Sequence, residues 1–215
     1  MTLLTAEEEE FFRSEQSVHE RKYLAGTNPR QQSGFGRDEH DWMRFRRPIA
    51  DAVDKDGSFL DIGCANGLLM ESVATWARED GHVVEPFGLE ISEKLADLAR
   101  SRLPAWHDRI FVGNALFWTP PARFDFVRTE MVYVPVTRRR EYVDRLLNSF
   151  VAEGGRLIVC SYGSSRPDGQ RTEPLTDAFA AWGLTIAGVF DALSDHGFIT
   201  TRVVALTRAA ELIRP

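Results

Sequence analysis

The sequence predicts an α/β fold, a doubly wound mixed sheet of seven strands with the last one antiparallel, preceded by an N-terminal helical cap. Two observations predict it. From residue 58 onward, short apolar strand patterns alternate with helical ones, which is typical of a parallel sheet with helices on both faces. The last two strand patterns, 184–189 and 198–206, are joined by a turn too short for a helical crossover. We therefore expect these two strands to pair antiparallel.

The composition is that of an ordinary globular domain. The chain has 215 residues, of which 43% are hydrophobic and 27% charged, which excludes a disordered chain, a collagen and a coiled coil. No apolar stretch approaches the roughly 18 residues of a membrane span, and the first ten residues are acidic where a signal peptide is basic. We expect a cytoplasmic protein without a membrane partner. Cys64 and Cys160 are too few for a disulfide framework.

Residues 1–54 are expected to form the helical cap and a lid, and residues 55–215 the main domain. Thr5 to Glu8 is a capping-box pattern that opens a helix. The first helix is expected to run to Leu24, with Phe12, His19 and Tyr23 on one face. A Pro- and Gly-containing loop at 28–36 precedes a second helix with Trp42, Phe45, Ile49 and Val53 on one stripe, which Pro48 either kinks or restarts.

Capping residues and helix-ending residues delimit the predicted helices of the main domain. Ser92 is expected to cap a helix that ends before Pro104, Thr137 to cap a later helix, and Gly154–Gly155 to close that later helix. The other predicted helices are 67–78 and 174–182. Besides the final pair, the predicted strands are 59–62, one within 84–91, 110–112, 124–128 and 156–160.

A glycine-rich loop from Asp61 to Gly67 follows the first predicted strand. Glycines permit a tight turn and close approach of a ligand to the backbone, and the carboxyl edge of a parallel sheet is where such folds bind ligands. A dinucleotide fingerprint would need a small residue at position 68, where Leu68 stands. The Asp61 carboxylate would also repel a pyrophosphate, but not a cationic ammonium or sulfonium ligand.

Motifs in order along the chain resemble those of the class I S-adenosylmethionine (SAM)-dependent methyltransferases. Phe59–Gly67 is similar to their first motif, and Phe87–Ser92 to the end of their second strand, whose acidic residue, here Glu90, grips the ribose. Val112–Leu116 is similar to their third motif, with Asn114 where the family usually has Asp.

This resemblance covers roughly residues 50–207 and implies a Rossmann-like sheet, methyltransferase activity and SAM as the cofactor. The cofactor-binding residues that follow from it are Asp61, Gly63, Cys64, Ala65, Gly67, Glu90, Ile91, Asn114, Ala115 and Arg128.

The sequence constrains the choice of catalytic residues less than that of the cofactor-binding residues. Methyl transfer is an in-line displacement in which alignment provides much of the rate, so a general base is needed only for a protonated acceptor. The candidates for such a base are Glu130, Tyr133, His19 and His40, with Tyr162 also considered. We expect no metal, because no pair of His or Cys has the spacing of metal ligands.

The sequence predicts a methyltransferase that acts on a small molecule, in secondary metabolism, as a monomer or homodimer. One alternative is an RNA (ribosomal RNA) methyltransferase, because residues 21–47 hold seven basic and three acidic groups, a local charge of +4, and Arg138–Arg140 forms either a solvated turn or an anion-binding patch. Nucleic acid is therefore not the expected partner but is kept as an alternative. A third hypothesis is a non-catalytic SAM-binding protein.

Overall fold

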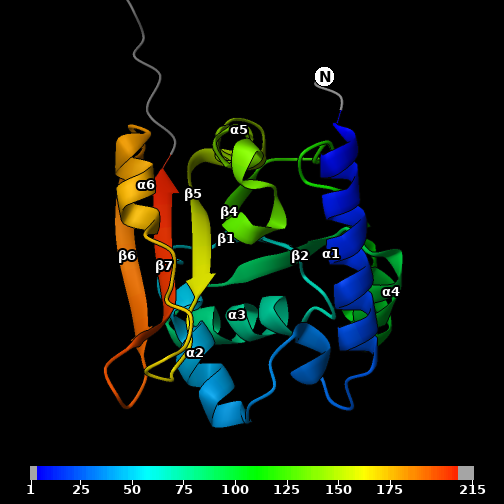
Figure 1. Ribbon diagram of the computed structural model, residues 1–215, viewed down its shortest axis with the longest axis horizontal. Helices are drawn as coiled ribbons and strands as arrows, with labels where there is room; N and C mark the ends of the chain where they lie inside the picture. Colours follow the sequence, from blue (N-terminus) through cyan, green and yellow to red (C-terminus); the bar gives the residue numbers. More distant parts are fainter. Residues whose placement is uncertain (1–3, 208–215) are drawn as a thin grey trace, which may run out of the picture.

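The computed structural model describes residues 4–207, which build one seven-stranded sheet in the order β3-β2-β1-β4-β5-β7-β6 (Figure 1). Strands β1 to β5 are parallel, and β7 lies antiparallel to both β5 and β6. The predicted mixed sheet with its antiparallel last strand is therefore confirmed. The strands are β1 Gly57–Ile62, β2 Val84–Glu90, β3 Ile110–Val112, β4 Phe124–Glu130, β5 Val151–Tyr162, β6 Thr185–Leu193 and β7 Ile199–Thr207.

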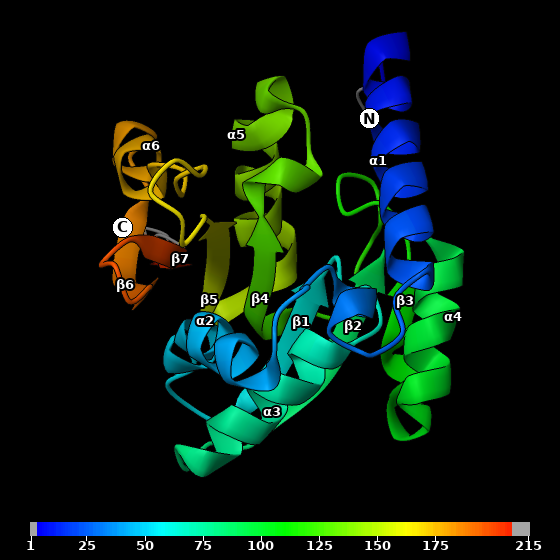
Figure 2. The same cartoon turned by 60° about the horizontal axis from the view of Figure 1, so that its bottom comes forward.

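Helices cover both faces of this sheet (Figure 2). The alternation of side chains along β1 separates two cores, since Phe59 packs with α2, α3 and α4 whereas Leu60 packs with α5 and α6. The helices of the first face are α2 Glu39–Asp51, α3 Leu68–Glu79 and α4 Glu93–Arg102. Those of the second are α5 Arg139–Arg145, which continues as a π-helical turn at Leu146–Phe150, and α6 Leu175–Ala181. Short 3-10 turns lie at Gln31–Ser33, Pro104–Arg109, Met131–Tyr133 and Val136–Arg138.

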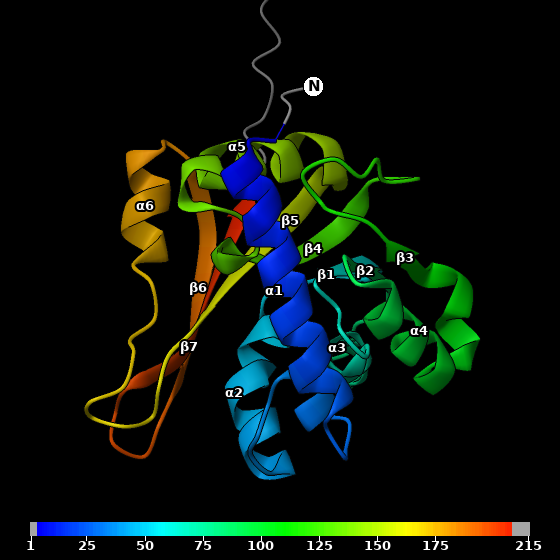
Figure 3. The same cartoon turned by 45° about the vertical axis from the view of Figure 1, so that its right-hand side comes forward.

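Helix α1, Ala6–Leu24, stands apart from these two layers. It passes in front of the sheet (Figure 3) and lies beside α4 (Figure 1). Its capping box is confirmed, because the Thr5 hydroxyl accepts the Glu8 N–H and the Glu8 carboxylate accepts the Thr5 N–H. Of its residues only Glu8 and Phe12 are buried. The helix is therefore held mainly by hydrogen bonds near its two ends. Glu8 accepts a hydrogen bond from Arg138, and Glu20 accepts hydrogen bonds from Ser92 and Lys94.

Helix α2 behaves differently from α1 although both belong to the predicted cap. Asp38 caps it by accepting the Asp41 N–H at 2.9 Å, and Pro48 lies inside one helix rather than starting a new one. Its apolar stripe joins the core beneath β6 and β7. The boundary at residue 54 stays a prediction, and residues 208–215 lie outside the described part of the chain.

Two sequence expectations about the α5 region are wrong. Thr137 does not cap α5: it lies in a preceding 3-10 turn, and the helix begins at Arg139 without a side-chain cap. Gly154–Gly155 does not close the helix, since β5 already begins at Val151. These glycines lie instead at a register shift of β5 against β4, where Gly154 has φ +69°. A bulge demands such a conformation as readily as a helix end does, so the glycine pair alone is ambiguous.

No helix between residues 4 and 207 is both long and apolar enough to cross a membrane. Location in the cytoplasm and the oligomeric state stay predictions. Cys64 and Cys160 are both buried and free.

Candidate active site

A cavity of about 240 Å³ lies at the carboxyl ends of β1, β2 and β4, beneath α1. Its floor is the glycine loop, and its walls are the segments that follow β2, β3, β4 and β5. Phe12, Gln16, His19 and Tyr23 of α1 line it from above. The predicted face of the first helix is therefore the face that closes the cavity.

The glycine loop reaches its shape through three left-handed residues, Gly63 (φ +75°), Ala65 (φ +47°) and Gly67 (φ +76°). A Cβ on Gly63 would lie 2.6 Å from the ring of Tyr133, so only glycine fits there. Gly67 has a different role. A Cβ there would meet Leu103 at 2.6 Å, and Gly67 does not line the cavity. It allows α3 to begin and to pack closely against the end of α4.

Two buried carboxylates flank this loop, Asp61 at the end of β1 and Glu90 at the end of β2. Glu90 accepts the N–H of Ala65 at 2.8 Å and that of Ser92 at 3.0 Å, so it ties the loop to β2. Burial raises the pKa of Glu90, while these backbone hydrogen bonds oppose the rise.

In the described part of the chain, only one of the two carboxylate oxygens of Asp61 has a hydrogen-bond partner. Its Oδ1 accepts a hydrogen bond from Arg128 at 3.2 Å, whereas Oδ2 is buried without a partner in the described part of the chain. Burial raises the pKa of Asp61 to about 6, although the Arg128 charge opposes the rise. An unpartnered carboxylate oxygen lining a cavity is a ready acceptor for a cationic donor.

The remaining predicted cofactor residues also line the cavity: Cys64, Ile91, Asn114 and Ala115. Asn114 uses its side-chain oxygen to accept the Leu116 N–H at 3.0 Å, which leaves its amide NH₂ as a donor. Burial raises the pKa of the Cys64 thiol well above its usual value. Cys64 is therefore a poor nucleophile and serves as a small wall residue.

Arg128 of β4 organises the wall beside the glycine loop. Its guanidinium is 2% exposed and donates to Asp61, Glu130, Tyr133 and Tyr162. The Tyr133 hydroxyl in turn donates to Glu130 at 2.7 Å. Both of the bonds to Glu130 are made to Oε1. Arg128 was predicted to bind the cofactor directly, and the structure shows it placing two carboxylates and two phenols around the cavity.

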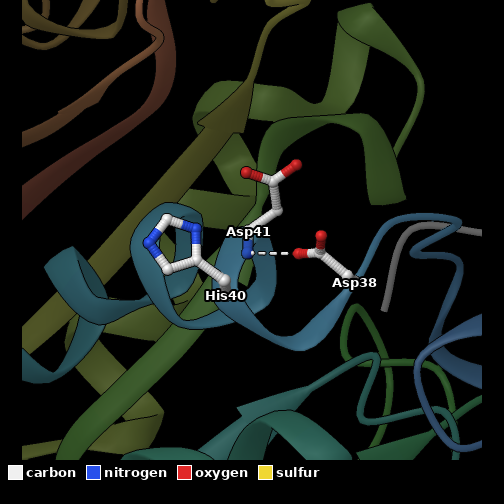
Figure 4. A group of neighbouring side chains, drawn as sticks. All are labelled: Asp38, His40 and Asp41. Carbon is white, nitrogen blue, oxygen red and sulfur yellow. Dashed lines mark hydrogen bonds between the residues drawn. The ribbon is translucent and has the colours of Figure 1, made fainter.

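The structure brings three of the four catalytic candidates, Glu130, Tyr133 and His19, into the cavity wall. His40 is exposed in the first turn of α2 and is not among the residues that line it. His40 lies beside Asp38 and Asp41, with potential ligand atoms within 4.8 Å (Figure 4). Both carboxylates already have partners, because Asp38 caps the helix and Asp41 pairs with Arg37 at 2.7 Å. The expectation that no metal is needed stays a prediction.

Trp42 and Arg46 are among the cavity residues that sequence reasoning missed. Trp42 was expected to be core, and its indole N–H does bond the Ser72 hydroxyl at 3.0 Å. Both residues lie on one face of α2, four positions apart, and this spacing was the available signal. The spacing alone could not show that this face of α2 borders a cavity.

Arg138–Arg140 does not form an anion-binding patch, since each of the three arginines pairs with a carboxylate. Arg138 bonds Glu8 and Glu141, Arg139 bonds Glu173, and Arg140 bonds Asp144. Two of these partners, Glu8 and Glu173, come from distant parts of the sequence. The cluster therefore attaches α1 and the segment before α6 to the body of the protein.

No family model matches the chain, and a search of curated proteins found no match. Solved structures do match. The N-methyltransferase NodS from Bradyrhizobium japonicum, solved with S-adenosylhomocysteine (SAH), has a TM-score of 0.66 at 16% identity and covers 91% of this chain and 98% of its own. The fold is that of the SAM-dependent methyltransferases.

Other neighbours with this fold differ in what they do. The 1,6-didemethyltoxoflavin N1-methyltransferase from Burkholderia thailandensis, solved with 1,6-didemethyltoxoflavin and SAH, has a TM-score of 0.65 at 16% identity, over 98% of this chain and 93% of its own. The [4+2]-cyclase SpnF has a TM-score of 0.55 at 16% identity, over 76% of this chain and 80% of its own. At this level of identity the likeness concerns the fold, and the activity must be argued from the site.

Proposed function

We propose that this protein is a SAM-dependent methyltransferase that acts on a small-molecule acceptor. The observation that carries the proposal is the pair of buried carboxylates around the left-handed glycine loop, with Asp61 Oδ2 left without a partner. A ligand that suits this donor set has a cationic group for Asp61 and hydroxyls for Glu90. SAM and SAH carry both, an amino group and a ribose.

The residues present fit this cofactor. Asp61 would hold its amino group, Glu90 its ribose hydroxyls and the Asn114 amide its adenine. When bound, SAM supplies an electrophilic methyl group on a sulfonium centre. The acceptor would then lie toward the ends of β4 and β5, beneath α1.

Glu130 is the group that we propose as the base for an acceptor that arrives protonated. Arg128 and Tyr133 both donate to Oε1 of Glu130, which fixes the carboxylate and leaves Oε2 to accept a proton. Tyr133 is thereby a positioning residue. His19 of α1, which also lines the cavity, is the second candidate, and its Nδ1 lies 3.9 Å from the Glu15 carboxylate.

A small acceptor is supported by the roof over the site. Phe12, His19 and Tyr23 close the cavity from above, which suits a molecule enclosed in a pocket rather than a polymer lying on a surface. We place the acceptor in secondary metabolism as part of the same proposal, with the RNA and non-catalytic alternatives as outcomes of its test.

The test is incubation with SAM carrying a trideuterated methyl group and fractionated cell extract, followed by mass spectrometry. We expect a labelled small molecule with the wild-type protein and a much reduced yield with Glu130→Gln. Label in RNA would support the RNA alternative. SAH binding by calorimetry without any labelled product would support the non-catalytic alternative.

A further inference from the structure

Arg46 differs from the other arginines of α2. Arg44 pairs with Asp195 at 2.6 Å, and Arg47 pairs with Glu79 at 2.8 Å and with Asp80. Arg46 pairs with no carboxylate of residues 4–207, and its hydrogen bond to the Phe45 carbonyl is long, at 3.4 Å. Yet it is half-buried and lines the cavity.

Aromatic rings hold the Arg46 guanidinium in place. Its central carbon lies 3.7 Å from the centre of the Tyr162 ring, 5.1 Å from that of Phe35 and 5.4 Å from that of Trp42. A guanidinium stacked at 3.7 Å has one face covered, so its remaining N–H donors point outward along its edge. The rings thus fix the orientation of the cation without satisfying its hydrogen bonds.

Tyr162 links Arg46 to Glu130, because its ring stacks on Arg46 and its hydroxyl accepts a hydrogen bond from Arg128, which also bonds Glu130. The pKa of Tyr23 is raised to about 12, chiefly by burial and further by the charge of Glu130, while the charge of Arg46 acts in the opposite direction. The pKa of the Cys160 thiol is raised chiefly by burial and further by the charge of Glu130, whereas the charges of Arg128 and Arg46 oppose the rise. Glu130 is already bonded to Arg128 and Tyr133. Arg46, whose guanidinium makes no ion pair within residues 4–207, therefore retains donors for a ligand.

We propose that Arg46 is the receptor for a carboxylate group inside this cavity. The planar N–H edge of arginine matches the two oxygens of a carboxylate, and an ion pair would compensate a half-buried cation for its lost water. The inference deepens the proposed function and rests on it, because the carboxylate has two possible sources in that reaction: an acid group on the acceptor or the amino-acid end of the cofactor.

The position of Arg46 favours the acceptor as the source. Its stacking partner Tyr162 ends β5, which is separated from β1 by β4 in the sheet. Of the groups that we assign to the cofactor, Glu90 and Asn114 follow strands on the other side of β1, and Asp61 lies at the end of β1 itself, so none of them lies on the strand of Tyr162. On this geometry the enzyme methylates a small organic acid whose carboxylate lies on Arg46 and whose reacting atom lies near Glu130.

The first arm of the test measures binding of SAH and of its decarboxylated analogue by calorimetry. The variants are Arg46→Gln, Arg46→Lys and, as a control on the same helix, Arg44→Gln. We expect SAH affinity to stay within about twofold of wild type in all three. If Arg46→Gln instead weakens SAH by about 10- to 100-fold but leaves the decarboxylated analogue unaffected, the cofactor supplies the carboxylate that Arg46 binds.

The second arm titrates benzoate into the SAH-loaded protein by saturation-transfer NMR, with benzamide as the neutral comparison. We expect wild type and Arg44→Gln to bind benzoate in preference to benzamide, Arg46→Gln to lose at least about tenfold and Arg46→Lys to lose less. The proposal is overturned if Arg46→Gln changes neither SAH nor benzoate binding. Failure of the wild-type protein to bind SAH would refute the proposed function instead, and benzoate titrated without SAH then tests Arg46 alone.

Discussion

Glu90 is the residue whose replacement tests the cofactor site most directly. Its carboxylate is buried and oriented by the N–H groups of Ala65 and Ser92. Glu90→Ala is expected to weaken SAH binding by about 2–4 kcal/mol, because two charge-assisted hydrogen bonds to the ribose are lost. Calorimetry measures the change, and Glu93→Ala, at an exposed position three residues later, is the control. Unchanged affinity in folded Glu90→Ala would refute the ribose assignment.

The raised pKa of Asp61 predicts that the stability of the fold depends on pH. Its pKa is about 6 in the fold against 3.8 for the free side chain, so the folded state binds more protons between these values. The free energy of unfolding should therefore fall as the pH rises from about 4 through 6, by up to about 3 kcal/mol from this group. Urea denaturation across this range measures the slope, which Asp61→Asn should reduce. An identical slope in that variant would show that other groups cause it.

Ligand binding should follow the opposite trend, because a cationic amino group prefers the ionised form of Asp61. SAH affinity is expected to rise by about tenfold between pH 5 and 7 and then level off. Calorimetry at several pH values tests this. Glu90 also has a raised pKa, and Asp61→Asn separates the two contributions. The assignment of Asp61 to the amino group fails if Asp61→Asn retains the full rise.

Helix α1 is a separable element whose removal should affect the acceptor more than the fold. It buries only Glu8 and Phe12, so deletion of residues 1–25 is expected to cost no more than about 2 kcal/mol of stability. Residues 26–36 should be kept, because the Pro29 carbonyl accepts a hydrogen bond from Asn66 at 2.8 Å and Phe35 packs on Trp42. The truncated protein should bind SAH and fail to methylate its acceptor.

Thermal denaturation, SAH calorimetry and the labelled-methyl assay together test this deletion. A truncated protein that methylates its acceptor at the wild-type rate would show that α1 is not part of the acceptor site.

The charge distribution of the folded protein argues against a nucleic-acid surface. The basic segment 21–47 is largely neutralised by the fold, as Arg37, Arg44 and Arg47 each pair with a carboxylate. With a net charge of −6, we expect RNA to bind no more tightly than about 10 µM at 150 mM salt. Filter binding with a ribosomal RNA fragment measures this. Tight binding with a steep salt dependence would favour the RNA alternative.

Local sequence patterns were enough to predict the order and type of most elements, and the part of the site that a few consecutive residues form. Thr5 and Ser92 are capping residues whose signal lies within one helical turn. The left-handed loop after β1 and the carboxylate at the end of β2 could be predicted because both depend on a few consecutive residues. The structure brings Asp61 and Glu90 to one cavity for the same reason, since parallel strands bring their ends to one edge; their roles toward a cofactor stay predictions.

Contacts between segments far apart in the sequence determine which polar groups already have partners and which remain for a ligand. Arg138 and Arg139 look like an anion site in sequence, yet carboxylates 130 and 34 positions away neutralise them. Arg46 looks like its neighbours on α2 but faces a cavity and stacks on Tyr162, more than 100 residues later. A hydrogen bond or ion pair depends on distances in space, whereas local pattern reports only the face of an element on which a residue lies.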